Sequence, residues 1–293
     1  MRLQSGSNPE EIAEMKEFAD WILDVGNGNV GGPNDGEAEI SIPDELLIKQ
    51  GDDPIKSIVD STYPNLIANL YEHTYFQERA IFAPTHEHVD SINDRLLQVV
   101  PGDEVTYLSC DSVDACDISV TTDHGMQSPE FLNSLKFSGI PNHKLVLKVG
   151  VPIMLLRNID QPNGLCNGTR LTVIKLEKSL ITARVITGTN IGFETLIPRM
   201  QLSPTDKSLP FKITRKQFPV SMCFAMTINK SQGQSLSHVD LFLPRPVFTH
   251  GQLYVAISRV KSKKGLKVLI CDKDMNVSST TTNVVYKEVL QKL

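Results

Sequence analysis

Apolar side chains recur at helical spacing in the first quarter of the chain. Residues 9–24 place them on one helical face behind Pro9 and two glutamates, which predicts an amphipathic helix that runs into a glycine- and acid-rich surface loop. The same spacing returns over 54–74 and is interrupted by Pro64, so two short helices are expected there. The sequence therefore opens with helices.

A strand, a turn and a helix come next. The run 79–83 is apolar, Pro84 and Thr85 supply a turn, and helical spacing resumes from His86, which is the pattern of an α/β unit. A further strand is expected at 104–109.

The middle of the chain has the texture of a β structure. Residues 144–198 alternate β-branched and polar positions between turn formers, which predicts a small antiparallel barrel or sandwich inserted in an α/β domain. Beyond it, short apolar runs are typical of buried parallel strands, and an amphipathic helix is expected at 283–292. These runs cover 221–227, 238–243 and 266–271.

Composition narrows the class of protein. The chain has 293 residues, of which 40% are hydrophobic, enough to bury one large core or two smaller ones. Neither an apolar run of roughly 18 residues nor the apolar region of a secretory signal is present, so we expect an intracellular protein with no membrane partner. The five cysteines form no C-x-x-C pair, which predicts reduced thiols and no metal site.

Charge is strongly divided along the sequence. Residues 1–130 carry 6 basic and 26 acidic side chains, whereas residues 131–267 carry 20 basic and 5 acidic ones. Such polarity suggests a basic surface for a polyanion, but charge alone favours solvated faces of opposite sign that attract each other.

Common nucleotide and metal motifs are missing from the sequence. Five lysines precede a serine, yet none has the glycine that a G-x-x-x-x-G-K-[ST] phosphate loop requires. The glycines at 26–32 follow a predicted helix, whereas a dinucleotide fingerprint follows a strand. No H-E-x-x-H occurs, and His86 and His88 are too close in sequence to share a helical face as ligands.

Two segments have the composition of a phosphate or nucleic-acid site. In AMTINKSQGQSL (225–236) an apolar run meets a turn with an ammonium, an amide and a glycine, which suits an anion. In GQLYVAISRVKSKKG (251–265) a buried helix ends at Arg259, followed by three lysines. Arg259 is either a functional cation or only a partner of the helix C-terminus.

The two segments together resemble the last two motifs of superfamily-one helicases of the Pif-like (petite integration frequency) and RecD-like type, including Helitron transposon helicases. RAIFAPTHEHVDSINDRLL (79–97) looks like the opening of that family's second motor domain, and residues 135–173 resemble its inserted SH3-like subdomain. The resemblance covers almost the whole chain but only the carboxyl-terminal half of a helicase. It implies an α/β fold with a RecA-like second motor domain and an SH3-like β-barrel insertion.

The resemblance also assigns roles to residues. It implies that Arg259 is a catalytic arginine finger, that Gln232 and Gly233 sense the nucleotide, and that Arg2, at the end of an N-x-R-like motif, reaches the γ-phosphate. Contacts to single-stranded DNA are implied for Thr227, Asn229, Lys230, Lys148 and Arg157; Asn229 departs from the family's usual histidine, and a solvated face explains Lys148 and Arg157 equally well.

The domain plan implied by the resemblance assigns 1–76 to the end of a first motor domain and a connector, 77–130 and 215–293 to the second motor domain, and 131–214 to the insertion. The expected function is that of a fragment of an ATP-dependent 5′–3′ DNA helicase, using ATP with Mg²⁺ and single-stranded DNA, with a separate first motor domain as a possible partner and a nuclear location. DNA repair, recombination, telomere maintenance and transposon replication are the processes that the family implies. The alternatives are a nucleic-acid-binding remnant without ATPase activity and a protein-interaction module built on the small barrel.

Overall fold

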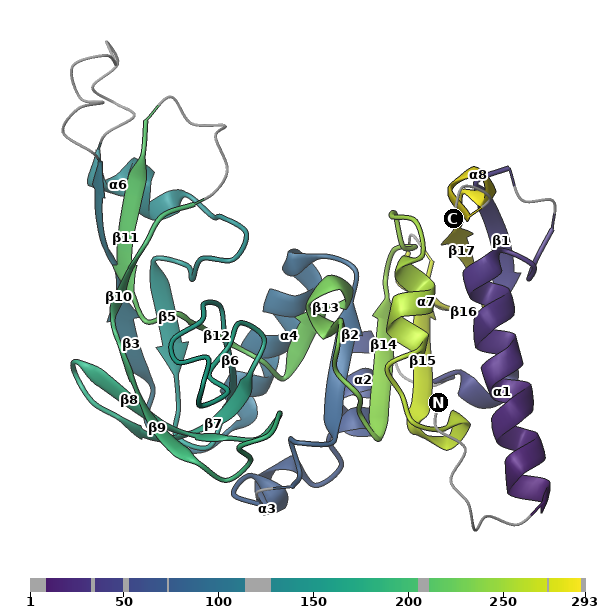
Figure 1. Cartoon of the computed structure of the whole chain (residues 1–293), viewed down its shortest axis with the longest axis horizontal. Helices are drawn as coiled ribbons and strands as arrows, with labels where there is room; N and C mark the ends of the chain where they lie inside the picture. Colours follow the sequence, from purple (N-terminus) through teal and green to yellow (C-terminus); the bar gives the residue numbers. More distant parts are fainter. Residues whose placement is uncertain are drawn as a thin grey trace. The chain divides into compact units, whose positions relative to one another are not determined.

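The chain forms two compact units, which we describe separately (Figure 1). The computed structural model describes residues 9–32, 35–49, 53–72, 74–113, 128–204, 211–272 and 274–290. Unit 1 comprises residues 1–69, 78–96 and 224–293, and unit 2 comprises residues 70–77 and 97–223. The fold of both together is mixed α/β.

A mainly parallel five-stranded sheet is the centre of unit 1. Its strand order is β13-β2-β14-β15-β16, with the first four strands parallel and β16 antiparallel to β15. The strands are almost continuous apolar runs, as expected when both faces of a parallel sheet are covered. They cover Ala225–Thr227 (β13), Arg79–Ala83 (β2), His238–Leu243 (β14), Leu266–Cys271 (β15) and Val277–Ser278 (β16).

Helices pack around this sheet. Helix α2 lies against β2, β14 and β15, and it begins at Pro54 behind Asp53, whose side chain accepts a hydrogen bond from the Lys56 amide. The helices of unit 1 are α1 (Pro9–Asn27), α2 (Pro54–Thr62), α3 (Leu66–Asn69), α4 (His86–Val99), α7 (Gln252–Ile257) and α8 (Lys287–Leu290), with 3-10 turns η1 (Asp44–Leu46), η3 (Ile228–Ser231) and η4 (Lys263–Gly265). Within the described ranges, no helix combines the length and apolar character that a membrane span requires.

Unit 2 is built from antiparallel strands. Its largest sheet has the order β12-β6-β7-β8-β9, and smaller sheets pair β10-β11-β4 and β3-β5. Strand β8 buries every second residue, which is why its sequence alternates. The strands cover Val105–Leu108 (β3), Cys110–Val113 (β4), Lys144–Leu147 (β5), Pro152–Leu155 (β6), Arg170–Leu176 (β7), Leu180–Val185 (β8), Glu194–Pro198 (β9), Met200–Leu202 (β10), Ile213–Gln217 (β11) and Val220–Met222 (β12); helix α6 covers Pro129–Ser134.

Two predicted elements are placed wrongly. The run 221–227 is two strands, because β12 pairs antiparallel with β6 whereas β13 pairs parallel with β2. The predicted helix 283–292 begins only at Lys287, because the threonine-rich segment Thr280–Val284 forms β17 and pairs with β1 (Glu37–Ser41), inside the predicted surface loop.

The predicted domain boundaries also differ from the two units. Within the predicted segment 1–76, α1 packs on α7 and α2 packs on the parallel sheet of unit 1, whereas residues 70–76 belong to unit 2. Residues 97–130 group with unit 2, in which β3 pairs with β5 and β4 pairs with β11.

Candidate functional site

The turn after β13 carries five of the residues that the sequence singled out. Thr227 ends the strand and is buried, whereas Asn229 lies exposed on η3 with Lys230 half-buried beside it. Gln232 and Gly233 follow η3 and are exposed. The turn therefore presents an ammonium, two amide side chains and backbone groups at the carboxyl end of a parallel strand, where open α/β sheets bind ligands.

Local hydrogen bonds fix the shape of this turn. The buried Ser231 hydroxyl donates to the Ile228 carbonyl at 2.7 Å, and the Gln234 amide donates to the Ser231 carbonyl at 3.0 Å. Gly233 has a φ of +82°, and a Cβ added there would meet nothing within 4 Å. The glycine is therefore required by the backbone conformation and not by lack of space.

Arg259 lies just beyond the carboxyl end of α7 and is half-buried. Its Nε donates to the Val255 carbonyl at 3.0 Å, and its Nη2 donates to the Ser258 hydroxyl at 2.8 Å. These are the contacts of an arginine that caps its own helix, as the simpler interpretation of the sequence predicted. Both acceptors are uncharged, so these two contacts do not neutralise the positive charge of the guanidinium.

Backbone pairing joins the Arg259 segment to the turn after β13. The Leu236 amide donates to the Arg259 carbonyl at 3.0 Å, and the Lys261 amide donates to the Leu236 carbonyl at 3.0 Å. Leu236 and Val260 form a parallel bridge, and α7 also contacts η3. Two segments separated in the sequence thus form one continuous piece of unit 1, which contains Thr227, Asn229, Lys230, Gln232, Gly233 and Arg259.

Two of the three lysines after Arg259 lie close to acidic side chains. Lys263 forms an ion pair with Glu45 at 2.6 Å, and the hydrogen bond with Glu45 raises the pKa of Lys263. Lys261 lies 4.0 Å from Glu78. These ion pairs favour the interpretation that surfaces of opposite charge attract each other within the protein, and not that these lysines form a surface for a polyanion.

The remaining predicted residues lie elsewhere. Lys148 and Arg157 belong to unit 2, and Arg2 lies outside the described residues. Lys148 is only 7% exposed, and its ammonium donates to the Val100 carbonyl at 2.8 Å, which does not favour the predicted DNA contact. Arg157 is half-buried and donates to the Ser203 carbonyl at 3.3 Å.

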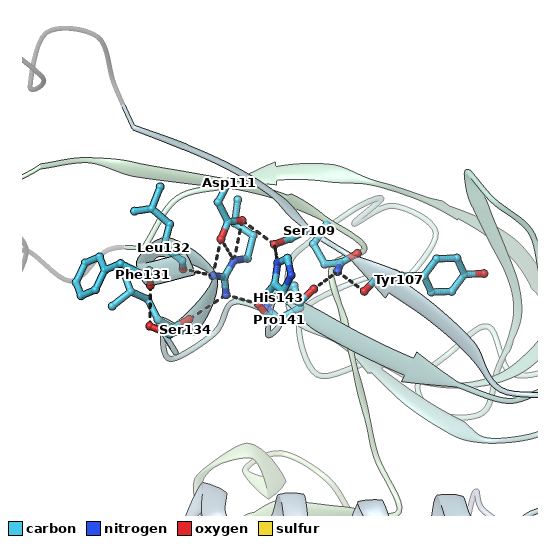
Figure 2. Close-up of polar contacts among 11 residues, drawn as sticks. Tyr107, Ser109, Asp111, Phe131, Leu132, Ser134, Pro141 and His143 are labelled. Atoms are coloured by element: carbon cyan, nitrogen blue, oxygen red, sulfur yellow. Dashed lines mark hydrogen bonds and ion pairs between the residues drawn. The ribbon is translucent and has the colours of Figure 1, made fainter. Parts of the chain in front are cut away.

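Unit 2 contains an elaborate polar cluster that sequence reasoning missed (Figure 2). Arg215 on β11 lies opposite Asp111 on β4, and its Nε and Nη2 atoms both donate to the carboxylate, the shortest contact being 2.7 Å. The remaining guanidinium bonds go to the carbonyls of Leu132, Leu135 and Pro141. Both charged side chains are at most 2% exposed. The pairing of residues 104 apart had no local signal in the sequence.

The same cluster contains the residue types of a hydrolase triad in a different geometry. The Ser109 hydroxyl donates to Asp111 Oδ1 at 2.7 Å and lies 2.8 Å from His143 Nδ1, so the serine stands between the acid and the imidazole (Figure 2). In a triad the imidazole stands in the middle and takes the serine proton. We therefore interpret the cluster as structural: it holds α6 and the following loop against the paired strands β4 and β11.

Asp240 is a buried carboxylate in the middle of β14. Burial raises its pKa to about 6, against hydrogen bonds from the Ser61 and Thr62 hydroxyls that lower it. It links α2 to the sheet, and its one signal in the sequence is an acid within an apolar run. Among the described residues, no group of three or more His, Cys, Asp or Glu side chains could hold a metal ion.

Comparisons with known proteins agree on one family. The family model for the 2B domain of the DNA helicase Pif1 matches residues 130–176. The ATP-dependent DNA helicase PIF1 of Xenopus laevis is 33% identical over 192 residues, which are 64% of this chain and 27% of that protein. The human protein of the same name is 32% identical over 191 residues, 63% of this chain and 26% of that protein. The chain thus spans about a quarter of these relatives' length.

Solved structures show the same fold. A crystal structure of Pif1 helicase from Candida albicans matches with a TM-score of 0.57 and 22% identity, over 98% of this chain and 58% of that chain. Pif1 helicase from Bacteroides, in complex with ADP-AlF3 and single-stranded DNA, matches with a TM-score of 0.57 and 20% identity, over 100% of this chain and 54% of that chain. In both sequence and fold, the chain is thus similar to the carboxyl-terminal part of Pif1-type DNA helicases.

Proposed function

We propose that this chain supplies the second RecA-like motor domain and an SH3-like insertion of an ATP-dependent 5′–3′ DNA helicase. Unit 1, with its parallel sheet, would be the motor domain, and the antiparallel sheets of unit 2 would contain the insertion. The observation that carries the proposal is the backbone pairing of Leu236 with the Arg259 segment, because it unites the two helicase-like motifs in one piece of structure.

Arg259 is the residue that we expect to act on the nucleotide. Among the described residues, its guanidinium donates to a carbonyl and a hydroxyl, so an anion could replace these acceptors without leaving a carboxylate unpaired. A planar guanidinium matches two oxygens of a phosphate group, and it stabilises the charge that develops during phosphoryl transfer. Gln232 and Gly233, on the adjoining turn, would respond to the phosphates.

The donor groups present fit a nucleotide shared with a separate first motor domain. Cationic and amide groups suit phosphate oxygens, whereas Mg²⁺ requires oxygen ligands such as carboxylates. The residues that this chain brings to the site are cationic and amide groups, so we propose that the other domain would hold the Mg²⁺ that accompanies ATP. When bound, the metal would neutralise phosphate charge, and this chain would contribute the guanidinium.

Single-stranded DNA is the proposed second ligand. Asn229 and Lys230 lie on the turn at the edge of the sheet, with Thr227 behind them, and such groups contact phosphates without reading sequence. A phosphate contact of Arg157, on unit 2, is a separate prediction. A nuclear location, together with a role in DNA repair, recombination, telomere maintenance or transposon replication, follows only from the family and stays a prediction.

The experiment compares the chain alone with a fusion to the first motor domain of a Pif1-type helicase. The sequence has no phosphate loop, so the chain alone should not hydrolyse ATP, whereas the fusion should show hydrolysis stimulated by single-stranded DNA. A fusion that binds DNA but never hydrolyses ATP would contradict the helicase function. That outcome would favour the second candidate, a nucleic-acid-binding remnant, which the missing phosphate loop supports.

A further inference from the structure

The carboxyl end of α1 packs against α7, the helix that precedes Arg259. A Cβ added to Gly26 would lie 2.6 Å from Cδ2 and 3.0 Å from Cγ of Tyr254, which is on α7. The Tyr254 ring therefore packs against the bare backbone of α1. The Ser258 amide donates a hydrogen bond to the Tyr254 carbonyl at 3.0 Å, and the Arg259 guanidinium donates to the Ser258 hydroxyl. Ser258 therefore links Tyr254 to the Arg259 guanidinium.

Gly26 is explained by this contact and not by its own conformation. It is the last residue but one of α1 and lies outside the positive-φ region, so its backbone conformation does not require glycine. The nearby Tyr254 ring is a feature of the described structure that does. The atoms that an alanine would strike belong to the base of a ring and cannot swing away like the end of a flexible chain.

Strand β17 joins the carboxyl end of α1 to the amino end of α7. The fully buried Asn283 side chain donates to the Val25 carbonyl at 2.8 Å, one residue before Gly26. The Gly251 amide, at the start of α7, donates to the Val284 carbonyl at 2.9 Å. Consecutive residues of β17 thus fasten the end of one helix and the beginning of the other.

We propose that α1 is a positioning element for Arg259, and that the contact of Gly26 with the Tyr254 ring sets the place of α7. Gly26 and Tyr254 are then positioning residues, which act through the helix and touch no nucleotide. The proposal adds a role for the amino-terminal helix, and its catalytic consequence rests on the function proposed above. Displacement of a catalytic group by about 1 Å is sufficient to slow a reaction strongly.

Hydrogen exchange on the full chain tests the positioning directly. Gly26→Ala should accelerate exchange of the Val255 and Ser258 amides, which are hydrogen-bonded within α7, at least about tenfold. Exchange in β2 should stay unchanged, because β2 packs mainly against other elements than α1 and α7. The matched control is Gly32→Ala, which adds the same methyl group where nothing lies within 4 Å.

A compensating variant separates the contact from general destabilisation. In a Tyr254→Ala background the ring is gone, so Gly26→Ala should have no further effect on exchange in α7. Equal acceleration throughout the sheet, no acceleration in α7, or additive effects of the two substitutions would each overturn the proposal.

The fusion with a first motor domain supplies the catalytic readout. Gly26→Ala should lower kcat for ATP at least about tenfold while the Kd for single-stranded DNA stays within about twofold. An active fusion whose kcat is insensitive to Gly26→Ala would overturn the catalytic role. An inactive parent fusion would contradict the proposed function instead, and the exchange experiment, which needs neither ATP nor DNA, would still decide whether α1 positions the Arg259 helix.

Discussion

Arg215 in unit 2 and Arg259 in unit 1 show how differently one residue type can be used. Arg215 is buried, paired with the Asp111 carboxylate and bonded to three carbonyls. Arg259 is half-buried and is held by one carbonyl and one hydroxyl. A charge that is fully satisfied inside the protein has no capacity left for a ligand, so the richer network is the structural one and the poorer network is the candidate site.

Loss of Arg215 should have the largest effect on stability. Arg215→Ala leaves the buried Asp111 carboxylate without its cation, which should destabilise unit 2 by about 3–5 kcal/mol in chemical denaturation. Arg184→Ala is the matched control, because Arg184 pairs with Glu194 at the surface of unit 2 and should cost less than about 1 kcal/mol. If both variants lost the same free energy of unfolding, the difference between the buried and the exposed ion pair would be contradicted.

Asp240 extends the comparison to a buried acid that accepts hydrogen bonds from hydroxyl groups. Its pKa is raised to about 6 in the folded protein, so the folded state binds the proton more tightly than the unfolded state. Protonated Asp240 therefore stabilises the folded protein at low pH. This contribution to the free energy of unfolding should fall by on the order of 1–3 kcal/mol between about pH 4 and pH 7.

The Asp240→Asn variant should lack this part of the pH dependence. Denaturation midpoints measured from about pH 4 to pH 7 check the prediction, with Asp60→Asn, at the surface of α2, as the control that keeps the wild-type profile. A variant profile parallel to that of the wild type would show that Asp240 is not the responsible group.

Lys230 tests the exposed turn as a phosphate site. Lys230→Ala should weaken binding of single-stranded DNA by a few-fold and reduce the slope of log K against log salt by about one unit. Fluorescence anisotropy between about 50 and 200 mM salt measures both quantities. Lys56→Ala removes a lysine from the acidic part of the chain and should leave the slope unchanged; an unchanged slope for Lys230→Ala would exclude a phosphate contact.

Arg259 should have the smallest effect on stability. Its hydrogen bonds cap one short helix, so Arg259→Ala should lower the free energy of unfolding by less than about 1 kcal/mol. Thermal unfolding of the full chain measures this. A loss as large as that of Arg215→Ala would identify Arg259 as a structural residue.

The parallel sheet was largely predictable from the sequence. Strands β2, β14 and β15 begin and end at the predicted residues, because a buried parallel strand is an uninterrupted apolar run between turns. The run 221–227 was not resolved into β12 and β13, since hydrophobicity does not tell which sheet a buried strand joins. Which segments pair is a property of the tertiary structure.

The candidate site was predictable only as separate segments. Motif resemblance identified the turn around Gln232 and the helix before Arg259, but not the Leu236 pairing that joins them. The resemblance suggested Lys148 as a contact to DNA, whereas its ammonium donates to a backbone carbonyl. Local composition does not reveal which cations find partners inside the fold, and for that reason Arg215 and Asp111 also went unnoticed.

The rate of ATP hydrolysis by the fusion carrying Arg259→Ala tests the central claim most directly. At saturating single-stranded DNA, we expect kcat to fall at least about 100-fold with nearly unchanged DNA affinity, and Arg259→Lys not to restore it, because an ammonium cannot span two phosphate oxygens. Arg95→Ala, which removes a surface arginine of unit 1 paired with Asp53, is the control and should retain the parent rate. An Arg259→Ala fusion with a rate within a few-fold of the parent would show that Arg259 only caps its helix.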